Sequence, residues 1–488
     1  MKKIFALIAA VMFSITLVAC GGDRTGNKGG KLVEWYELSE DVEFDTTKKI
    51  TIEFWHRMGA DGQKIVQKWI GEFNEIYPNI TVVETKAATD YNALADKIAL
   101  EITTGNEPDI AESYPDHIAR YAEADNAVLA LNNFISHPTL GYSEDEIADF
   151  LSGLWAEGSS YDNEGSILSL PFTKSSEALY YNKTYFDAHE IDGKKYTEII
   201  EEEGLTWDKI FKIAEDIKKR ESDAIPFGYD SSDNLFITAS AQWGAGYTEY
   251  NSKTGVGEVT FNNDTSKEMV KYFKDKVDKG LMITKDLNGD AYTSDIMKTG
   301  KKLYMYVGST GGSKYAFDGM DQSVFDAGYT VGVTALPSKD GVTRKQIQQG
   351  PNINLLVKED EQRMIAAWLF AKFMLEAERT AEFALQSGYA PLRHSAYETD
   401  TWKNYVAGIK EKPTSINEGK KKAAKDAIDM FRNNESVFFT SAVFNLSSRT
   451  RNEVGSLITT IFSSKATGED LNKFINDEYT KSYEFITN

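Results

Sequence analysis

The side chains best suited to catalysis or metal binding are few and scattered along the chain. Its 488 residues include five histidines and one cysteine. No two histidines have the spacing of zinc ligands, and there is no second thiol to help them. The phosphate loop G-x-x-x-x-G-K-[ST], the H-E-x-x-H helix and the G-x-S-x-G nucleophile elbow are also missing from the sequence. The pattern predicts no metal site, no cofactor and no catalytic residues.

Carboxylates are abundant, with 75 Asp and Glu in the chain. Residues 286–290 (DLNGD) hint at a calcium loop, but the glycine is in the fourth position and Met297 occupies the twelfth. A turn explains this segment better. A pair of glycosidase acids needs no fixed spacing in sequence. Because nothing in the sequence links any two of these acids, a surface glycoside hydrolase is kept only as a less favoured alternative.

The only cysteine, Cys20, follows an uncharged apolar run that begins after two lysines. A basic start, a short apolar core and small residues at the cut site are typical of a secretory signal. The run is short for a membrane span. Its end, LVAC, resembles a bacterial lipoprotein signal, in which the cysteine is lipidated. We expect a signal peptide over residues 1–19 and a polar, glycine-rich tether over residues 20–47. There are two alternatives: the protein is secreted and Cys20 has no role, or Cys20 is a buried thiol of the folded protein.

The formal net charge of −21 makes nucleic acid and anionic membranes poor partners. About 460 residues remain after the leader, which is too many for one hydrophobic core and suits two large lobes. With 12% aromatic residues and 10 prolines, the composition is globular. The chain is therefore expected to fold as two large globular lobes.

Strands alternate with helices in the first folded stretch. Residues 49–55 (KITIEFW) predict a strand, residues 61–77 a helix, and residues 80–83 a second strand. A helix over 91–103 and a short strand over 109–111 follow. The helix over 61–77 has one apolar face, formed by Ile65, Val66, Trp69, Ile70, Phe73, Ile76 and Tyr77. This order predicts an α/β fold with a parallel sheet covered by helices on both faces.

The same pattern returns in the second half of the chain. Thr206 is a candidate cap of one helix and Asp264 of another. Strands are predicted over 328–336 and 352–357, and one long helix over 361–385. The tail from residue 415 is mostly helical, and its KKKAAK stretch predicts a solvated helix face.

Several segments, taken together and in order, resemble the solute-binding proteins of bacterial ABC importers. The family concerned includes maltose-binding and glycerol-3-phosphate-binding proteins, and the resemblance runs from about residue 48 to the C-terminus. The most specific segment is LPFTKSSEALYYNKTYFD, over residues 170–187. The others are FWHRMGADGQKIVQKWIGEFNEIYPNITV, TTGNEPDIAESYPDHIARYAE, TWDKIFKIAEDIKK, KTGKKLYMYVGSTGG, YTVGVTALP and QSGYAPLR.

The resemblance implies a two-lobed, periplasmic-binding-protein-like (type II) fold with a hinge and an interlobe cleft. Solute binds in the cleft, and the closed form docks on permease subunits of an ABC transporter. We expect an N-terminal lobe of residues 48–176 and 350–388, and a C-terminal lobe of residues 177–349 and 389–488. The protein would be a monomer outside the cytoplasm, held to the cell membrane only by its lipid. It would transport or signal rather than catalyse.

Residues that match cleft positions of the family combine aromatic faces with hydroxyl and acid groups, which suits a sugar. Trp55 and Trp243 could equally well belong to a hydrophobic core. The expected ligand-binding residues are Trp55, His56, Tyr91, Tyr114, Asp116, Ser176, Glu177, Trp243, Ser309, Thr310, Gly350 and Tyr389.

The chain departs from both branches of the family. Glycerol-phosphate relatives pair the phosphate with an arginine near the C-terminal helices, where this chain aligns Val443, with Arg449 and Arg451 displaced. Their glutamate falls on Pro115. The stacking tryptophan of the maltose type falls among residues 309–311. We expect a carbohydrate, because no phosphate anchor is evident, and keep glycerol 3-phosphate or a related phosphodiester as the alternative.

Overall fold

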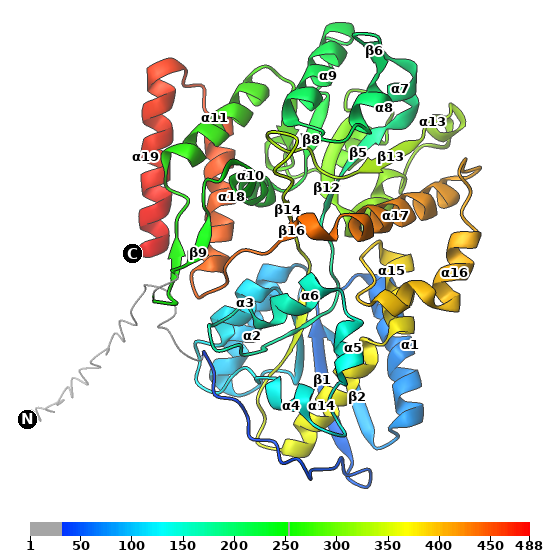
Figure 1. Ribbon diagram of the computed structural model, residues 1–488, viewed down its shortest axis with the longest axis vertical. Helices are drawn as coiled ribbons and strands as arrows, with labels where there is room; N and C mark the ends of the chain where they lie inside the picture. Colours follow the sequence, from blue (N-terminus) through cyan, green and yellow to red (C-terminus); the bar gives the residue numbers. More distant parts are fainter. Residues whose placement is uncertain (1–31, 252–253) are drawn as a thin grey trace, which may run out of the picture.

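The computed structural model describes residues 32–251 and 254–488. Two lobes stacked along the long axis are joined by extended segments near the middle of the molecule (Figure 1). Each lobe has a five-stranded sheet with helices packed around it and its own hydrophobic core. The predicted α/β class and the two-lobed architecture are confirmed.

The sheet of the N-terminal lobe is mixed rather than purely parallel. Strands β1, β2 and β3 are parallel, but β15 pairs antiparallel with both β3 and β4. The reason is that β15 enters the sheet from the other lobe. In sheet order the strands are β2 (Ile80–Lys86), β1 (Ile50–His56), β3 (Ile110–Ser113), β15 (Asn352–Leu355) and β4 (Leu170–Pro171).

Helix α1 (Ala60–Ile76) shows how the predicted pattern produces this packing. Four of its predicted apolar residues are buried, whereas Ile76 at its end is 58% exposed. Helix α2 (Tyr91–Thr104) begins where the Asp90 carboxylate accepts the backbone N–H of Ala93 at 2.8 Å. The other helices of this lobe are α3 (Pro115–Tyr121), α4 (Asn132–Ser136), α5 (Glu144–Ala148), α6 (Ser152–Ala156) and α14 (Glu361–Met374).

The C-terminal lobe repeats the plan around a second mixed sheet. In order its strands are β11 (Met282–Thr284), β8 (Phe227–Tyr229), β12 (Met305–Ser309), β5 (Glu177–Asn182) and β13 (Val331–Thr334). Its helices are α7 (Lys183–Ala188), α8 (Tyr196–Ile200), α9 (Trp207–Arg220), α10 (Ser232–Trp243), α11 (Asp264–Asp278), α12 (Thr293–Met297), α13 (Gln322–Asp326), α18 (Ser447–Ser463) and α19 (Gly468–Thr487). Two hairpins complete it: β6 (Glu190–Ile191) with β7 (Lys194–Lys195), and β9 (Thr248–Tyr250) with β10 (Gly257–Val259).

Capping at two helix starts tests the predicted boundaries in this lobe. Thr206 caps α9, because its hydroxyl accepts the backbone N–H of Lys209. The cap of α11 is Asn263 and not Asp264, one residue earlier than predicted. Both side chains are good caps, so the sequence alone could not separate them.

Two antiparallel crossing segments form the hinge. Residues 172–176 lead from β4 in one sheet to β5 in the other, and residues 348–351 lead back to β15. The backbones of Ser175 and Gln349 exchange hydrogen bonds of 2.8 and 2.9 Å. A short pair beside them joins β14 (Gln346–Ile347) to β16 (Phe438–Phe439). The crossing predicted near Gly350 is present.

Residues 32–47 do not form part of a free tether, as the sequence predicted, but pack along the N-terminal lobe (Figure 1). The indole N–H of Trp35 donates to the Ser166 hydroxyl at 2.9 Å, and Val33 is buried. Tyr36 and Phe44 pack against the core of this lobe. Aromatic side chains in a polar stretch are the physical reason for the difference. Cys20 and the predicted signal peptide lie outside the described residues.

The segment after Tyr389, predicted in the C-terminal lobe, packs into the N-terminal lobe. Ala390 and Leu392 are buried there, and Arg393 donates to the backbone carbonyl of Leu375 at 2.6 Å. The long helix predicted over 361–385 is divided into α14 and α15 (Ala377–Ser387). Helix α16 (Asp400–Ala407) then leads to α17 (Ile416–Asn433), which packs on β13 of the C-terminal lobe.

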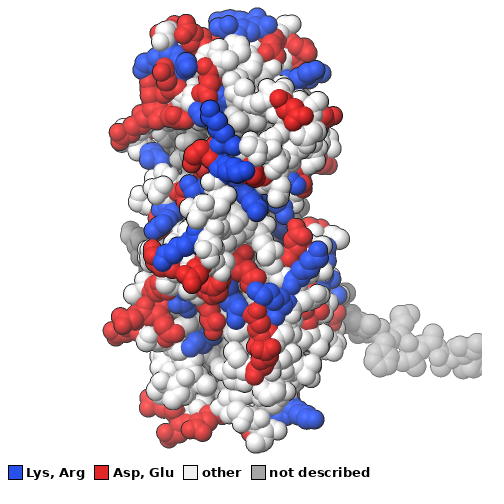
Figure 2. All heavy atoms as spheres, turned by 90° about the vertical axis from the view of Figure 1, so that its right-hand side faces the viewer, with Lys and Arg blue, Asp and Glu red and all other residues white. Residues whose placement is uncertain are grey.

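Surface charge and helix hydrophobicity indicate how the protein could meet nucleic acids and membranes. Acidic and basic side chains are interspersed over both lobes on the face in Figure 2, with a short run of basic side chains near its middle. Among the described helices, none is long and apolar enough to cross a membrane.

Candidate ligand-binding cleft

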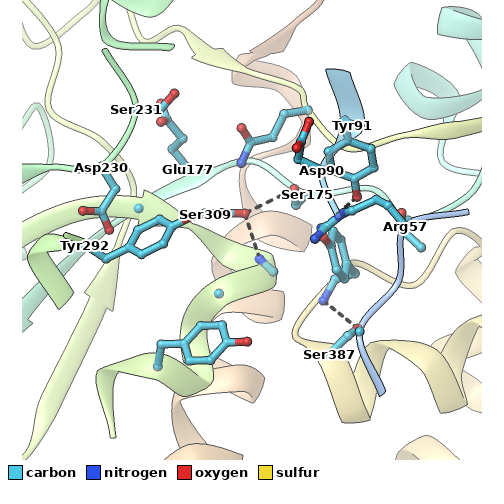
Figure 3. A pocket seen from close by; sticks show the side chains of 18 of the residues that line it. Arg57, Asp90, Tyr91, Ser175, Glu177, Asp230, Ser231, Tyr292, Ser309 and Ser387 are labelled. Carbon is cyan, nitrogen blue, oxygen red and sulfur yellow. Dashed lines mark hydrogen bonds between the residues drawn. The ribbon is translucent and has the colours of Figure 1, made fainter. Parts of the chain in front are cut away.

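A cleft of about 1200 Å³ opens between the two lobes at the hinge. Its size would hold several sugar rings, since sites for drug-sized ligands measure roughly 300–1,000 Å³. Figure 3 shows Arg57 and Tyr91 on one side, Asp230 and Tyr292 on the other, and Ser175 and Ser309 between them. Most of these side chains follow the carboxyl ends of strands, where ligands meet an open α/β sheet.

The wall of the N-terminal lobe is built from an arginine, a glutamate and tyrosines. Arg57 follows β1, and its Nη2 donates to the Tyr91 hydroxyl at 3.0 Å while the guanidinium lies 4.2 Å from the centre of that ring. Tyr114 meets Tyr91 edge to face, with ring centres 4.7 Å apart. Glu112 in β3 accepts the backbone N–H of Arg57 at 2.9 Å. These contacts hold an aromatic and cationic surface toward the cleft.

The tyrosines of this wall stay neutral. Burial raises the pKa of Tyr91, Tyr114 and Tyr389 above the ordinary value. A neutral phenol both donates and accepts a hydrogen bond. This dual capacity matches the hydroxyl groups of a polyol.

The floor of the cleft is a hydrogen-bonded network at the hinge. Glu177 accepts the Tyr229 hydroxyl at 2.6 Å and the Asn234 amide at 3.1 Å. The same amide donates to Gln349 on the second crossing segment at 2.6 Å. Burial raises the pKa of Glu177 to about 8, although the two donors oppose that shift. The floor therefore couples the start of β5 and the second crossing segment to α10.

The wall of the C-terminal lobe carries a half-buried acid and exposed aromatic rings. Asp230 accepts the backbone N–H and the hydroxyl of Thr293 at 2.7 and 2.6 Å. Burial raises its pKa to about 6, against those two hydrogen bonds. Tyr292 is 53% exposed and Tyr315 48% exposed, an unusual state for side chains this large. Exposed rings in a cleft are suited to stacking on an apolar ligand face.

Arg451 corrects the expectation that the cleft has no arginine from the C-terminal helices. It projects from α18, and its Nε lies 2.7 Å from the Asp233 carboxylate. Its Nη2 also donates to the side-chain oxygen of Asn234. Val443, the residue aligned with the family arginine, is buried among core residues of the N-terminal lobe. An insertion or deletion of a few residues before α18 would place Val443 opposite the family arginine in a sequence alignment, while Arg451 takes its place in the folded cleft.

Six of the residues proposed from the sequence line the cleft together. They come from the N-terminal lobe, the hinge and the C-terminal lobe. These six are Tyr91, Tyr114, Asp116, Glu177, Ser309 and Tyr389.

The other six do not line it: five have side chains held by packing or hydrogen bonds elsewhere, and Gly350 has no side chain. His56 is fully buried and bonds to Glu84 at 2.6 Å. Trp55 and Trp243 pack beside core clusters of the N-terminal and C-terminal lobes. The remaining three, Ser176, Thr310 and Gly350, are buried at the hinge, where Thr310 Oγ1 accepts the backbone N–H of Ser176 at 3.2 Å.

Sequence reasoning missed several residues that shape the cleft. Arg57 and Glu112 carried a usable signal, since both are polar and close to the carboxyl end of a predicted strand. Asp230 and Asn234 flank the start of α10, which the sequence pattern did not reveal. Within the described residues no group of three or more His, Cys, Asp and Glu could hold a metal ion.

The chain is similar to characterised binding proteins. It is 22% identical over 355 residues to the sn-glycerol-3-phosphate-binding periplasmic protein of Escherichia coli (strain K12), covering 71% of this chain and 75% of the relative. The structure of UgpB from Mycobacterium tuberculosis in complex with glycerophosphocholine matches with a TM-score of 0.65, at 18% identity, over 89% of this chain and 98% of that one.

Two sugar-bound structures share the fold to the same extent. Maltose-bound MalE3 of T. maritima has a TM-score of 0.66 at 15% identity, over 88% of this chain and 99% of its own. Lmo0181 from Listeria monocytogenes, in complex with cycloalternan, has a TM-score of 0.66 at 15% identity, over 90% and 98%. These matches confirm the type II binding-protein fold. Because the profile of the bacterial extracellular solute-binding proteins matches residues 68–411, the chain belongs to that family and is a binding protein, not an enzyme.

Proposed function

We propose that this protein captures an oligosaccharide in its interlobe cleft and delivers it to the permease of an ABC importer. The observation that carries the proposal is the combination of neutral tyrosines, exposed aromatic rings and hydrogen-bonding acids and amides around one large cleft. Rings can cover the C–H faces of a sugar, while acids and amides bind its hydroxyl groups. A site of this size suits more than one sugar unit.

Contacts between the lobes support a mechanism of closure around the ligand. Lys314 of the C-terminal lobe lies 3.3 Å from Asp61 of the N-terminal lobe. Asn92 and Asn452 meet 3.5 Å apart across the same cleft. These polar contacts are few, so ligand contacts with both lobes would bias the hinge toward the closed form. A permease would then recognise that form.

The ligand-binding residues we propose are the six that line the cleft, together with Arg57, Asp230, Tyr292 and Tyr315. Tyr91, Tyr114 and Tyr389 would pack against sugar rings and bind hydroxyls. Asp116 has no hydrogen bond of its own among the described residues and would accept one from the ligand.

A glycerol phosphate or phosphodiester is the second candidate, favoured by the arginines in the cleft. Arg451 occupies the C-terminal wall, and the 22% identical relative is named for glycerol 3-phosphate. However, the described lining holds ten Asp and Glu against five Lys and Arg. Arg451 is already paired with Asp233. Such a lining disfavours a phosphate dianion, so we place carbohydrate first.

A ligand screen distinguishes these candidates. The melting temperature of the purified protein would be followed with neutral and acidic oligosaccharides, sn-glycerol 3-phosphate and glycerophosphocholine, and hits confirmed by calorimetry. A ligand at 100 times its Kd stabilises the native state by about 2.7 kcal/mol, which gives a clear shift. Binding of an oligosaccharide without hydrolysis is expected. Binding of glycerol phosphates alone would contradict the carbohydrate proposal.

We also propose that the protein is a monomer on the outer face of the cell membrane, attached through lipid on Cys20. This proposal rests on the LVAC sequence after the apolar run. Cys20→Ala should release the protein from the membrane fraction, or leave the leader uncleaved, without changing its stability. A variant that stays on the membrane with a normally processed leader would disprove the anchor.

A further inference from the structure

Arg57 differs from most cations of the cleft because it has no acidic partner. Among the described residues, no carboxylate lies at ion-pair distance from its guanidinium. Arg451 is paired with Asp233 at 2.7 Å, Lys298 with Asp295 at 2.6 Å, and Lys314 with Asp61 at 3.3 Å. The charge of Arg57 therefore has no acid in direct ion-pair contact, although Glu112 acts on it from a longer distance.

The immediate partners of Arg57 are neutral groups. Its Nη2 donates to the Tyr91 hydroxyl, and the ring of Tyr91 lies under the guanidinium. Its Nε is buried and has no hydrogen-bond partner among the described atoms. Glu112 accepts the backbone N–H of Arg57 at 2.9 Å and so fixes the loop that carries the side chain, and it also accepts the Tyr91 hydroxyl at 3.5 Å. The guanidinium is held in place, but at least one of its N–H donors has no hydrogen-bond acceptor among the described atoms.

Lys285 is the other cation of the lining without an acid at ion-pair distance among the described residues. Its ammonium lies 4.7 Å from the centre of the Tyr292 ring on the opposite wall. It is close enough to Asp230 to lower the pKa of that acid slightly, against the larger effect of burial. Arg57 is thus the better anion site, because it faces neutral phenols.

We propose that Arg57 binds an anionic group of the captured solute, and that the solute is an acidic oligosaccharide carrying a single carboxylate. This inference rests on the proposed function and adds the substrate class. A planar guanidinium matches the two oxygens of a carboxylate, and hydrogen bonds of this kind are among the strongest. Tyr91 and Tyr389 line the cleft beside Arg57 and provide hydroxyl contacts for the same sugar unit.

The charge of the lining favours a group with one negative charge over a phosphate dianion. One unpaired guanidinium balances one negative charge, whereas the surrounding acids would repel a second. Neutral sugars would leave Arg57 desolvated in the closed cleft without a compensating partner, which costs affinity. The same residue therefore favours acidic sugars and disfavours neutral ones.

The test compares acidic oligosaccharides with neutral forms of the same chain. Aldotriouronic acid, 3′-sialyllactose and 6′-sialyllactose, which each carry one carboxylate, would be titrated beside their carboxyl-reduced forms by calorimetry. At least one acid form is expected to bind about tenfold or more tighter than its reduced form. Arg57→Gln should abolish that preference while the melting temperature of the free protein is retained. Arg57→Lys should keep part of the preference.

Lys64→Gln is the matched control, since it removes the same charge from an exposed position on α1. It should leave the preference unchanged. Three results would overturn the inference while carbohydrate binding itself stands. The acid and reduced forms could bind equally, the preference could survive Arg57→Gln, or Lys285→Gln could abolish it. If sn-glycerol 3-phosphate binds through Arg57 and no oligosaccharide binds, the anion has another source and the acidic sugar is wrong. If no sugar of either charge binds, the proposed function fails with it.

Discussion

The ammonium of Lys174 lies 2.5 Å from the carboxylate of Glu157, and both side chains are buried at the hinge. The same ammonium donates to the backbone carbonyl of Gly350 at 2.6 Å and to the Asn352 side chain at 3.1 Å. Burial lowers the pKa of Lys174, whereas Glu157 opposes that shift. Lys174 thus joins the first crossing segment to Glu157 of the N-terminal lobe through the ion pair, and to the second crossing segment through the Gly350 carbonyl.

Lys174→Met should therefore destabilise the protein strongly. Removal of one partner leaves a buried carboxylate unpaired, which costs about 3–5 kcal/mol. Urea unfolding would measure the loss. The control is Lys48→Met, which breaks a surface pair with Asp360 that is about 40% exposed on each side and should cost under about 1 kcal/mol. Similar effects of the two substitutions would show that the hinge pair does not fix the crossing segments.

The two exposed tyrosines of the C-terminal wall give a second prediction. Tyr292→Ala and Tyr315→Ala should each weaken oligosaccharide binding by about tenfold, because each loses roughly 1–1.5 kcal/mol of ring contact. The melting temperature of the free protein should hardly change, since both rings are about half exposed. Calorimetry of the ligand found in the screen would measure the affinities. Tyr483→Ala, on α19 far from the cleft lining, is the control for lost aromatic surface. Unchanged affinity in both cleft variants would exclude these rings from the site.

The sequence predicts the fold better than the site, for a physical reason. Apolar periodicity located α1 nearly to its ends, because burial of one face determines a helix, and Thr206 marked the start of α9. It could not tell which lobe receives the segment after Tyr389, since both cores are apolar. In the site, Tyr91 and Glu177 were found through family segments, whereas Arg57 and Asp230 were not. Trp55 and His56 end a strand like cleft residues, but their side chains point into packing.

Glu177 should make stability depend on pH in a specific direction. Its pKa is about 8 in the folded protein, above the ordinary value of 4.5, mainly because of burial. The folded state therefore binds this proton more tightly than the unfolded state. Its contribution to stability is complete below about pH 4.5 and is lost as the pH rises toward 8. The melting temperature should fall over this interval, and Glu177→Gln should reduce the fall.

Asp230 provides the internal comparison for this pH effect. Burial raises its pKa from 3.8 to about 6. Its contribution to stability is therefore lost as the pH rises through that lower interval. This loss remains in the Glu177→Gln variant. Melting temperatures at half-unit steps from pH 4.5 to 8.5 would separate the two groups. Parallel curves for the wild type and Glu177→Gln would mean that Glu177 is ionised in the folded protein at neutral pH.

Gly350 allows the hinge itself to be tested. Its φ of +98° belongs to a region that favours glycine, and a Cβ there would lie 2.1 Å from the backbone carbonyl oxygen of Thr173. Gly350→Ala must therefore push the two crossing segments apart. We expect a loss of more than about 2 kcal/mol in urea unfolding, since steric overlap adds to backbone strain. Small-angle scattering should show a smaller decrease in radius of gyration with ligand than in the wild type.

The control for backbone strain is Gly289→Ala, at a φ of +64° with nothing within 4 Å of the added Cβ. It should cost only about 1–2 kcal/mol and leave closure unchanged, because strain acts there without overlap. Scattering of the wild-type protein with and without saturating ligand comes first, since closure predicts compaction. If that radius does not change, the lobes form a rigid receptor, and the crossing segments at Gly350 hold a fixed cleft rather than a hinge.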